Sequence, residues 1–180
     1  GGLADVPDST RHAVADELFS RWRVAIERHG GAVDKFFGEM AMAVFGAPVA
    51  RGDDATRALR AALDLRRDLE ALCAEKVLAL QFRAGVNAGE VMYGRVGGDR
   101  PTVMGDAVNG AQRLQEAARP GEVLASAEVA RAAAGAQAFA KREPLRVRGR
   151  AEPVETLEVL GPRDVRTAVS PKEAPLIGRE

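Results

Sequence analysis

The chain has 180 residues, of which 46% are hydrophobic and 29% are charged, a composition typical of one ordinary globular domain. Basic and acidic residues both number 26, so the formal net charge is zero, and aromatic residues make up only 4%; these values exclude a nucleic-acid partner, which needs cations and stacking rings. No apolar run approaches the ~20 residues of a membrane span, and the single cysteine, Cys73, excludes an internal disulfide, so we expect a cytoplasmic protein without a membrane partner.

The first predicted element is a helix over residues 11–28. Its apolar side chains recur every four residues, as on the buried side of an amphipathic helix: Val14, Leu18, Trp22 and Ile26. Gly30 follows as a helix-ending glycine. We therefore expect this helix to pack one face on the core.

Residues 30–46 are predicted to form a tight β-hairpin. Gly38 precedes the polar Glu39 between two apolar runs, and glycine supplies the positive φ that a type II′ turn needs. Side chains alternate along a strand, so two sets of three are expected on opposite faces: Val33, Lys35 and Phe37, and Ala32, Asp34 and Phe36. Lys35 is thus a single cation on an apolar face, either snorkelling to solvent or placed for a ligand.

The remaining sequence alternates helices and strands. Asp53 and Asp54 open a second amphipathic helix that runs to about residue 75. The later elements are predicted as a hairpin of strands 77–86 and 90–96, a helix at 105–118, a strand at 122–126, a helix at 127–134, and a hairpin of strands 138–147 and 154–159. This order predicts an α+β fold with helices on one face of a largely antiparallel sheet. Residues 161–180 are predicted to be a linker rich in proline and charge.

Several polar side chains could contact an anionic nucleotide. Asn109 and Arg113 lie four residues apart on one helix face, and a guanidinium forks onto phosphate oxygens. Thr102, in the strand before that helix, carries a small donor and acceptor able to read a base edge. Arg148 and Arg150 add two cations at the tip of the last hairpin. Each of these residues could instead be an ordinary solvent-exposed side chain.

Five segments are each a weak signal alone but a strong one together, because of their order and spacing: residues 33–48, 53–55, 83–91, 102–114 and 120–124. Together they resemble the class III nucleotidyl cyclase catalytic domain, the fold shared by adenylyl and guanylyl cyclases. The resemblance implies a ferredoxin-like or palm-type sheet, largely antiparallel, with helices packed on it, over residues 1–160. It also implies that the monomer is inert, because in this family each site lies between two protomers. A head-to-tail homodimer with two equivalent sites is therefore expected.

The resemblance assigns the base, ribose and reacting phosphate to four residues. Lys35 falls at the position whose side chain contacts adenine N1 in adenylyl cyclases. Thr102 falls at the position of the second base-contacting residue, which binds the adenine amino group. Guanylyl cyclases usually carry Glu and Cys there, so ATP is the expected substrate and cyclic AMP the expected product. Asn109 and Arg113 match the pair that orients the ribose and stabilises the transition state at the α-phosphate. One of Arg148 and Arg150 corresponds to a family lysine that binds the terminal phosphates.

The metal site is where the sequence departs from the family. Two aspartates of the family hold two Mg²⁺ or Mn²⁺ ions, and the second falls on Glu39, whose longer side chain moves the carboxylate outward by ~1.5 Å. Asp5 superficially resembles the first aspartate, but its distance from the hairpin places it in the stretch before the first helix. The family's first strand is therefore expected to be missing or truncated in residues 1–160.

Two further interpretations follow from the same residues. A degenerate cyclase-homology module that dimerises and regulates an attached protein is the alternative to an active enzyme. Residues 174–180 resemble the opening of a P-loop ATPase domain, which would make that ATPase the regulated partner. A diguanylate cyclase is disfavoured, because its Gly-Gly-Asp/Glu-Glu-Phe turn is not present in the sequence.

Overall fold

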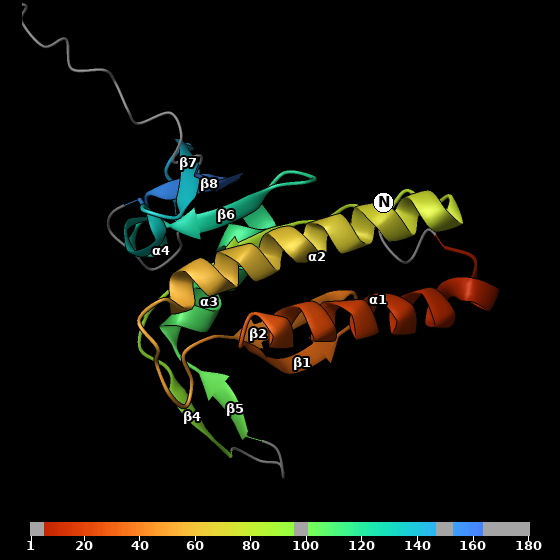
Figure 1. The fold of residues 1–180 in the computed structure, drawn as a ribbon, viewed down its shortest axis with the longest axis horizontal. Coiled ribbons are helices and arrows are strands. Elements are labelled where there is room, and N and C mark those ends of the chain that lie inside the picture. Colours follow the sequence, from red (N-terminus) through yellow and green to blue (C-terminus); the bar gives the residue numbers. More distant parts are fainter. Residues whose placement is uncertain (1–5, 96–100, 147–152, 164–180) are drawn as a thin grey trace, which may run out of the picture.

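The structure is a computed structural model that describes residues 6–95, 101–146 and 153–163. Four helices and eight strands alternate along these residues (Figure 1). Their bounds are α1 Asp8–Arg28, β1 Ala32–Phe37, β2 Met40–Val44, α2 Asp54–Lys76, β3 Ala84–Val86, β4 Met92–Arg95, β5 Pro101–Met104, α3 Asp106–Ala117, β6 Val123–Ser126, α4 Ala127–Ala133, β7 Gln137–Lys141 and β8 Thr156–Pro162. The predicted α+β class is confirmed.

The two long helices, α1 and α2, lie side by side along the molecule (Figure 1). The predicted four-residue stripe of α1 is buried along its whole length, at Val14, Leu18, Trp22 and Ile26. The Trp22 indole N–H donates to the backbone oxygen of Leu65 in α2 at 3.2 Å, and its ring meets that of Phe82 edge to face. Among the described residues, no helix is both long and apolar enough to span a bilayer.

The strands form three sheets. β1 pairs with β2 and β4 pairs with β5, both antiparallel, while the third sheet has the order β3-β6-β8-β7. Only β3 and β6 pair in parallel there. The predicted hairpin of residues 77–86 with residues 90–96 is therefore wrong. β4 pairs with β5 instead, and the segment after β3 lies against α3, where the Asn87 side chain donates to the backbone oxygen of Ala107 at 3.0 Å.

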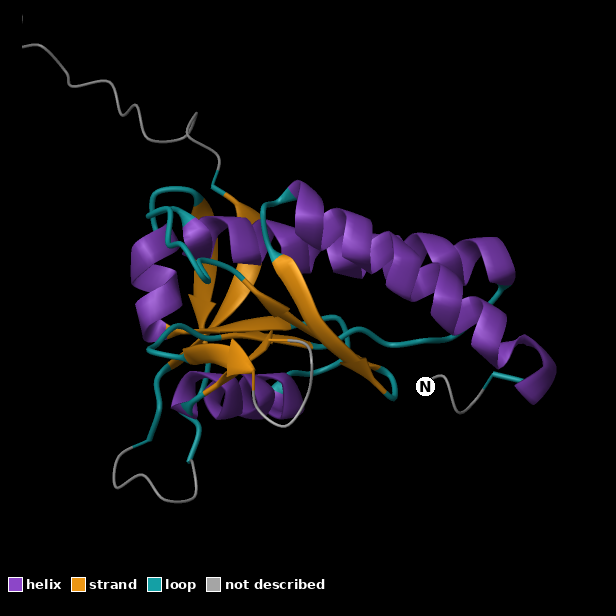
Figure 2. Cartoon of the chain, turned by 90° about the horizontal axis from the view of Figure 1, so that it is seen from below, coloured by secondary structure: helices purple, strands orange, loops and turns teal. Residues whose placement is uncertain are grey.

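Helices cover both faces of the third sheet, not one face as predicted (Figure 2). All four residues of β6 are buried, which is typical of a strand between two layers. Val123 and Ala125 belong to the large core with α1, α2 and α4. Leu124 instead packs with Leu114 and Ala118 at the α3 side. The third helix is thus a separate layer placed on the sheet by its own small core.

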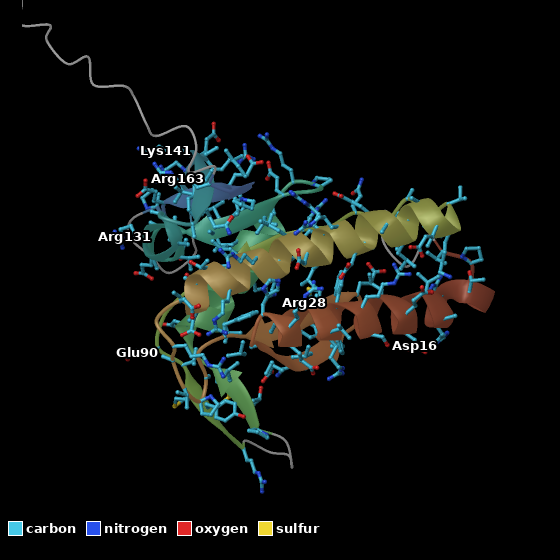
Figure 3. All side chains as sticks on the ribbon, viewed as in Figure 1. Asp16, Arg28, Glu90, Arg131, Lys141 and Arg163 are labelled. Atoms are coloured by element: carbon cyan, nitrogen blue, oxygen red, sulfur yellow. The ribbon has the colours of Figure 1, made fainter. Side chains whose placement is uncertain are left out.

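Ion pairs join α1 to α2 around Asp64. Its carboxylate contacts Arg28 Nη2 at 2.9 Å, His29 Nε2 at 2.7 Å and the guanidinium of Arg67 (Figure 3 labels Arg28 between the two helices). Burial raises the pKa of Asp64, but the hydrogen bond with His29 and the charges of Arg67 and Arg28 outweigh it, so this pKa lies below its usual value. Burial and the nearby Asp64 raise the pKa of Asp68 instead.

These opposite shifts predict opposite effects on stability. The stabilisation by Asp64 is fully present above its unfolded pKa of 3.8 and is lost as the pH falls through its lower folded pKa. Asp64→Asn is expected to lower the free energy of unfolding by about 1 kcal/mol at pH 7 and by nearly nothing at pH 2.5. Asp68→Asn, the matched control, should leave stability at pH 7 unchanged or raised. Denaturant unfolding at both pH values checks this; an equal loss at both for Asp64→Asn would contradict a charge effect.

Candidate active site

A buried carboxylate joins two of the sequence-predicted site residues. The β1–β2 register slips between Val33 and Lys35, which leaves Asp34 as the extra residue of a β-bulge. The Asp34 side chain is only 3% exposed. The Thr102 hydroxyl in β5 donates to Asp34 Oδ2 at 2.8 Å, and Lys35 Nζ lies 3.3 Å from the same oxygen. Lys35 and Thr102, 67 positions apart in the sequence, thus contact the same carboxylate oxygen.

The backbone of β5 makes a further contact with this carboxylate. The Val103 N–H donates to Asp34 Oδ1 at 3.2 Å, so both oxygens of Asp34 accept hydrogen bonds from β5. Lys35 remains 47% exposed, with its ammonium at the surface beside the half-buried Thr102. The bulge therefore breaks the predicted alternation of faces: Val33 and Asp34, which are neighbours in the chain, are both withdrawn from solvent.

The predicted turn places Glu39 at the tip of the β1–β2 hairpin. Gly38 has a φ of +57°, the positive value that the sequence predicted there. Glu39 is exposed. One carboxylate does not make a divalent cation site, which takes several oxygen ligands, and the described part of the chain contains no cluster of three or more potential metal-binding side chains. These residues alone therefore do not fit a complete metal centre.

Close backbone packing fixes the third helix and its two candidate residues. A Cβ at Gly85 of β3 would lie 2.2 Å from the backbone oxygen of Ala111 and 2.4 Å from the backbone nitrogen of Gln115, so α3 rests directly on this glycine. Asn109 and Arg113 are exposed on this helix. Neither side chain has a hydrogen-bond or ion-pair partner among the described residues, so both are available to a ligand.

Arg148 and Arg150, as well as Asp5 and residues 174–180, lie outside the described residues. Their predicted roles stay predictions.

Sequence reasoning missed Asp34, the residue that organises the site. A usable signal was present, since aspartate is depleted in strands and a carboxylate in an apolar strand needs partners if it is buried. Alternation alone assigned it to the face of Ala32 and Phe36 without a function. The bulge that withdraws Asp34 from solvent is set by pairing with β2 and by contacts with β5, neither of which appears in the local pattern.

Most of the chain matches a known protein family and known structures. The family model described as "Adenylate and Guanylate cyclase catalytic domain" matches residues 7–160. The chain is similar to the crystal structure of the adenylyl cyclase CyaB from P. aeruginosa, with 25% identity, a TM-score of 0.84, and coverage of 89% of this chain and 87% of that one. For the guanylyl cyclase Cya2 the values are 26% identity, a TM-score of 0.82, and coverage of 90% and 86%.

A curated relative is similar over a shorter stretch. The uncharacterized protein Rv1318c of Mycobacterium tuberculosis is 34% identical over 143 residues, which cover 76% of this chain and 26% of that protein. The chain thus spans about a quarter of the length of this relative. Because an adenylyl and a guanylyl cyclase resemble the chain almost equally, overall similarity does not choose between the two bases, and the side chains of the site must do so.

Proposed function

The chain belongs to the adenylate and guanylate cyclase catalytic domain family, and from this premise we propose that it converts ATP to 3′,5′-cyclic AMP and pyrophosphate. The observation that carries the choice of ATP is the pair Lys35 and Thr102, held together by Asp34. An ammonium donates to adenine N1, which carries a lone pair, whereas guanine N1 carries a hydrogen and would repel it. The single free cysteine supports a cytoplasmic location, where ATP is available.

The reaction forms a bond between the ribose 3′-oxygen and the α-phosphorus and breaks the bond from that phosphorus to the pyrophosphate oxygen. Negative charge accumulates on the phosphate oxygens as this happens. The Arg113 guanidinium is always protonated and can donate two parallel hydrogen bonds to those oxygens. Asn109, one turn earlier on α3, would hold the ribose so that its 3′-oxygen faces the phosphorus. Arg148 or Arg150 would bind the terminal phosphates.

We propose that the remaining parts of the site come from outside the described residues of one chain. Cyclases of this family use divalent metal ions, Mg²⁺ or Mn²⁺ in a two-ion site, and Glu39 is the described residue proposed to bind one. A second carboxylate would come from a strand that the described residues do not include. A second copy of the chain, arranged head to tail, would bring Glu39 of one protomer to the Asn109 and Arg113 of the other.

The test is cyclic AMP formation from ATP with Mn²⁺, measured on the purified protein together with any residues that its gene encodes before Gly1. We expect activity with ATP, at least about tenfold less with GTP, and a loss of at least about a hundredfold in Glu39→Ala because a misplaced or missing metal ligand costs this much in catalytic geometry. Glu128→Ala, which removes a carboxylate at the start of α4, is the matched control and should keep the parent activity.

A regulatory role without catalysis is the second candidate. The observation in its favour is that the described residues contain no cluster of three or more potential metal-binding side chains, and that the one proposed metal ligand among them is a glutamate. A well-folded dimer that binds ATP but forms no cyclic AMP with Mn²⁺ would support this role and overturn the enzyme. The attached ATPase suggested by residues 174–180 would then be the first partner to test.

A further inference from the structure

We propose that Asp34 fixes which of Lys35 and Thr102 donates a hydrogen bond to the base and which accepts one. Asp34 thereby determines the preference for adenine over guanine. The proposal rests on the proposed function in one respect, that Lys35 and Thr102 face the base of a bound nucleotide. It adds a residue that would not touch the nucleotide itself. Asp34 is in this sense a positioning residue, acting through the hydroxyl of Thr102 and the ammonium of Lys35.

The contacts of Asp34 fix which group donates and which accepts. An ionised carboxylate can only accept, whereas a backbone N–H and an ammonium can only donate. Asp34 accepts from the Val103 N–H through Oδ1, and its Oδ2 accepts from the Thr102 hydroxyl and faces the Lys35 ammonium. A buried carboxylate with these partners is costly to leave unpaired, so the arrangement is maintained without a ligand.

The single hydrogen of the Thr102 hydroxyl is therefore committed to Asp34. A threonine hydroxyl has one donor and two acceptor positions, so toward a ligand Thr102 offers lone pairs only. Lys35 offers the opposite, because its ammonium has three donors and no acceptor. Side by side, the two residues present one donor and one acceptor in a fixed order.

This order complements adenine and opposes guanine. Adenine presents the N1 lone pair and the N6 amino donor, which match the Lys35 ammonium and the Thr102 lone pairs. Guanine presents an N1 hydrogen and the O6 acceptor. The Lys35 ammonium would therefore face another donor, and the Thr102 lone pairs would face another acceptor. If Thr102 were free to rotate, its hydroxyl could donate to guanine O6 and half of the discrimination would disappear. The contact with Asp34 removes that freedom.

Asp34→Asn is the informative variant because it changes polarity at nearly constant shape. The Val103 N–H requires an acceptor, so the amide oxygen occupies the Oδ1 position and the amide NH₂ occupies the Oδ2 position. This NH₂ donates to Thr102, which frees the hydroxyl hydrogen for a ligand, and it no longer attracts Lys35. Asp16→Asn, the same change on the exposed surface of α1, is the matched control (Figure 3).

The experiment measures equilibrium binding of 3′-deoxy-ATP and 3′-deoxy-GTP, which lack the attacking hydroxyl, so the result does not depend on catalysis. We expect the parent and Asp16→Asn to prefer the adenine nucleotide and Asp34→Asn to reduce that preference about tenfold. Thr102→Ser should keep the preference, and Thr102→Val should reduce it to the part that the Lys35 ammonium supplies. Adding Asp34→Asn to Thr102→Val should change the preference by much less than about tenfold, since the part of its effect that acts through the Thr102 hydroxyl is already lost.

The outcomes separate this proposal from the proposed function. A parent that prefers the adenine nucleotide but forms no cyclic AMP would overturn the enzyme and leave this proposal standing. An unchanged preference in Asp34→Asn, or equal loss of both nucleotides, would overturn the positioning role while leaving the enzyme intact. If Asp34→Asn fails to fold, Thr102→Val decides, because an undiminished adenine preference there overturns the polarity argument. A parent that binds both nucleotides equally, or neither, also overturns it.

Discussion

Replacing Arg113 with alanine is expected to lower cyclic AMP formation at least about a hundredfold, because one preorganised donor to a developing negative charge is typically worth that much. Arg113 is exposed on α3 and has no ion-pair partner among the described residues, so its removal leaves no buried group unpaired. Stability and dimer formation should therefore match the parent. Arg131→Ala, an exposed arginine of α4 (Figure 3), is the matched control and should keep full activity.

Mixing two inactive variants extends this test to the arrangement of the dimer. If Glu39 and Arg113 of one site come from different protomers, a mixed dimer of Glu39→Ala and Arg113→Ala contains one intact site and one doubly altered site. Equal amounts that exchange freely should recover about a quarter of the parent activity. Recovery of none would contradict the shared site, and full activity of Arg113→Ala alone would contradict the role given to Arg113.

Gly85→Ala is expected to have the largest effect on the fold. The added Cβ would lie 2.2 and 2.4 Å from backbone atoms of α3, which cannot rotate away as a flexible side chain can. The helix must move outward or the strand must shift, and overpacking of this kind costs about 3 kcal/mol. Because α3 carries Asn109 and Arg113, we also expect cyclic AMP formation to fall sharply. Thermal or denaturant unfolding measures the first effect, and the cyclase assay measures the second.

Gly135→Ala provides the control for this prediction. No described atom lies within 4 Å of a Cβ at Gly135, and its φ is outside the left-handed region, so the same chemical change should alter stability by no more than about 0.5 kcal/mol. A Gly85→Ala protein as stable as the Gly135→Ala protein would show that α3 does not rest on β3 in the way described.

Local patterns predicted the elements better than their pairing. The periodicity of α1 and the glycine of the β1–β2 turn are properties of neighbouring residues, and both predictions are confirmed. The partner of β3 is not a local property. A glycine between two apolar runs suggested a hairpin for residues 77–96, but β3 instead pairs with β6, which begins at Val123. The pairings of β3 with β6 and of β4 with β5 exclude the hairpin, and the contact of Asn87 with Ala107 of α3 accompanies them.

The residues of the candidate site also differ in whether a local sequence pattern could predict them. The spacing of Asn109 and Arg113 could be read from the sequence because a helix relates them directly. Lys35 and Thr102 could be paired only through the family resemblance, since no local rule brings β1 beside β5. Asp34 was missed altogether, because its role depends on a bulge and on a backbone N–H of another strand.

The position of Asp34 between two small sheets has a consequence for errors in base choice. β4 and β5 form a sheet separate from that of β1 and β2, and Asp34 links them through both of its oxygens. Movement of β5 away from β1 would take Thr102 out of the site and break both hydrogen bonds at once. If the proposed base contacts hold, a loosened site would bind adenine less tightly without binding guanine more tightly. Thermal motion would therefore lower the preference for adenine only by weakening adenine binding, never by strengthening guanine binding.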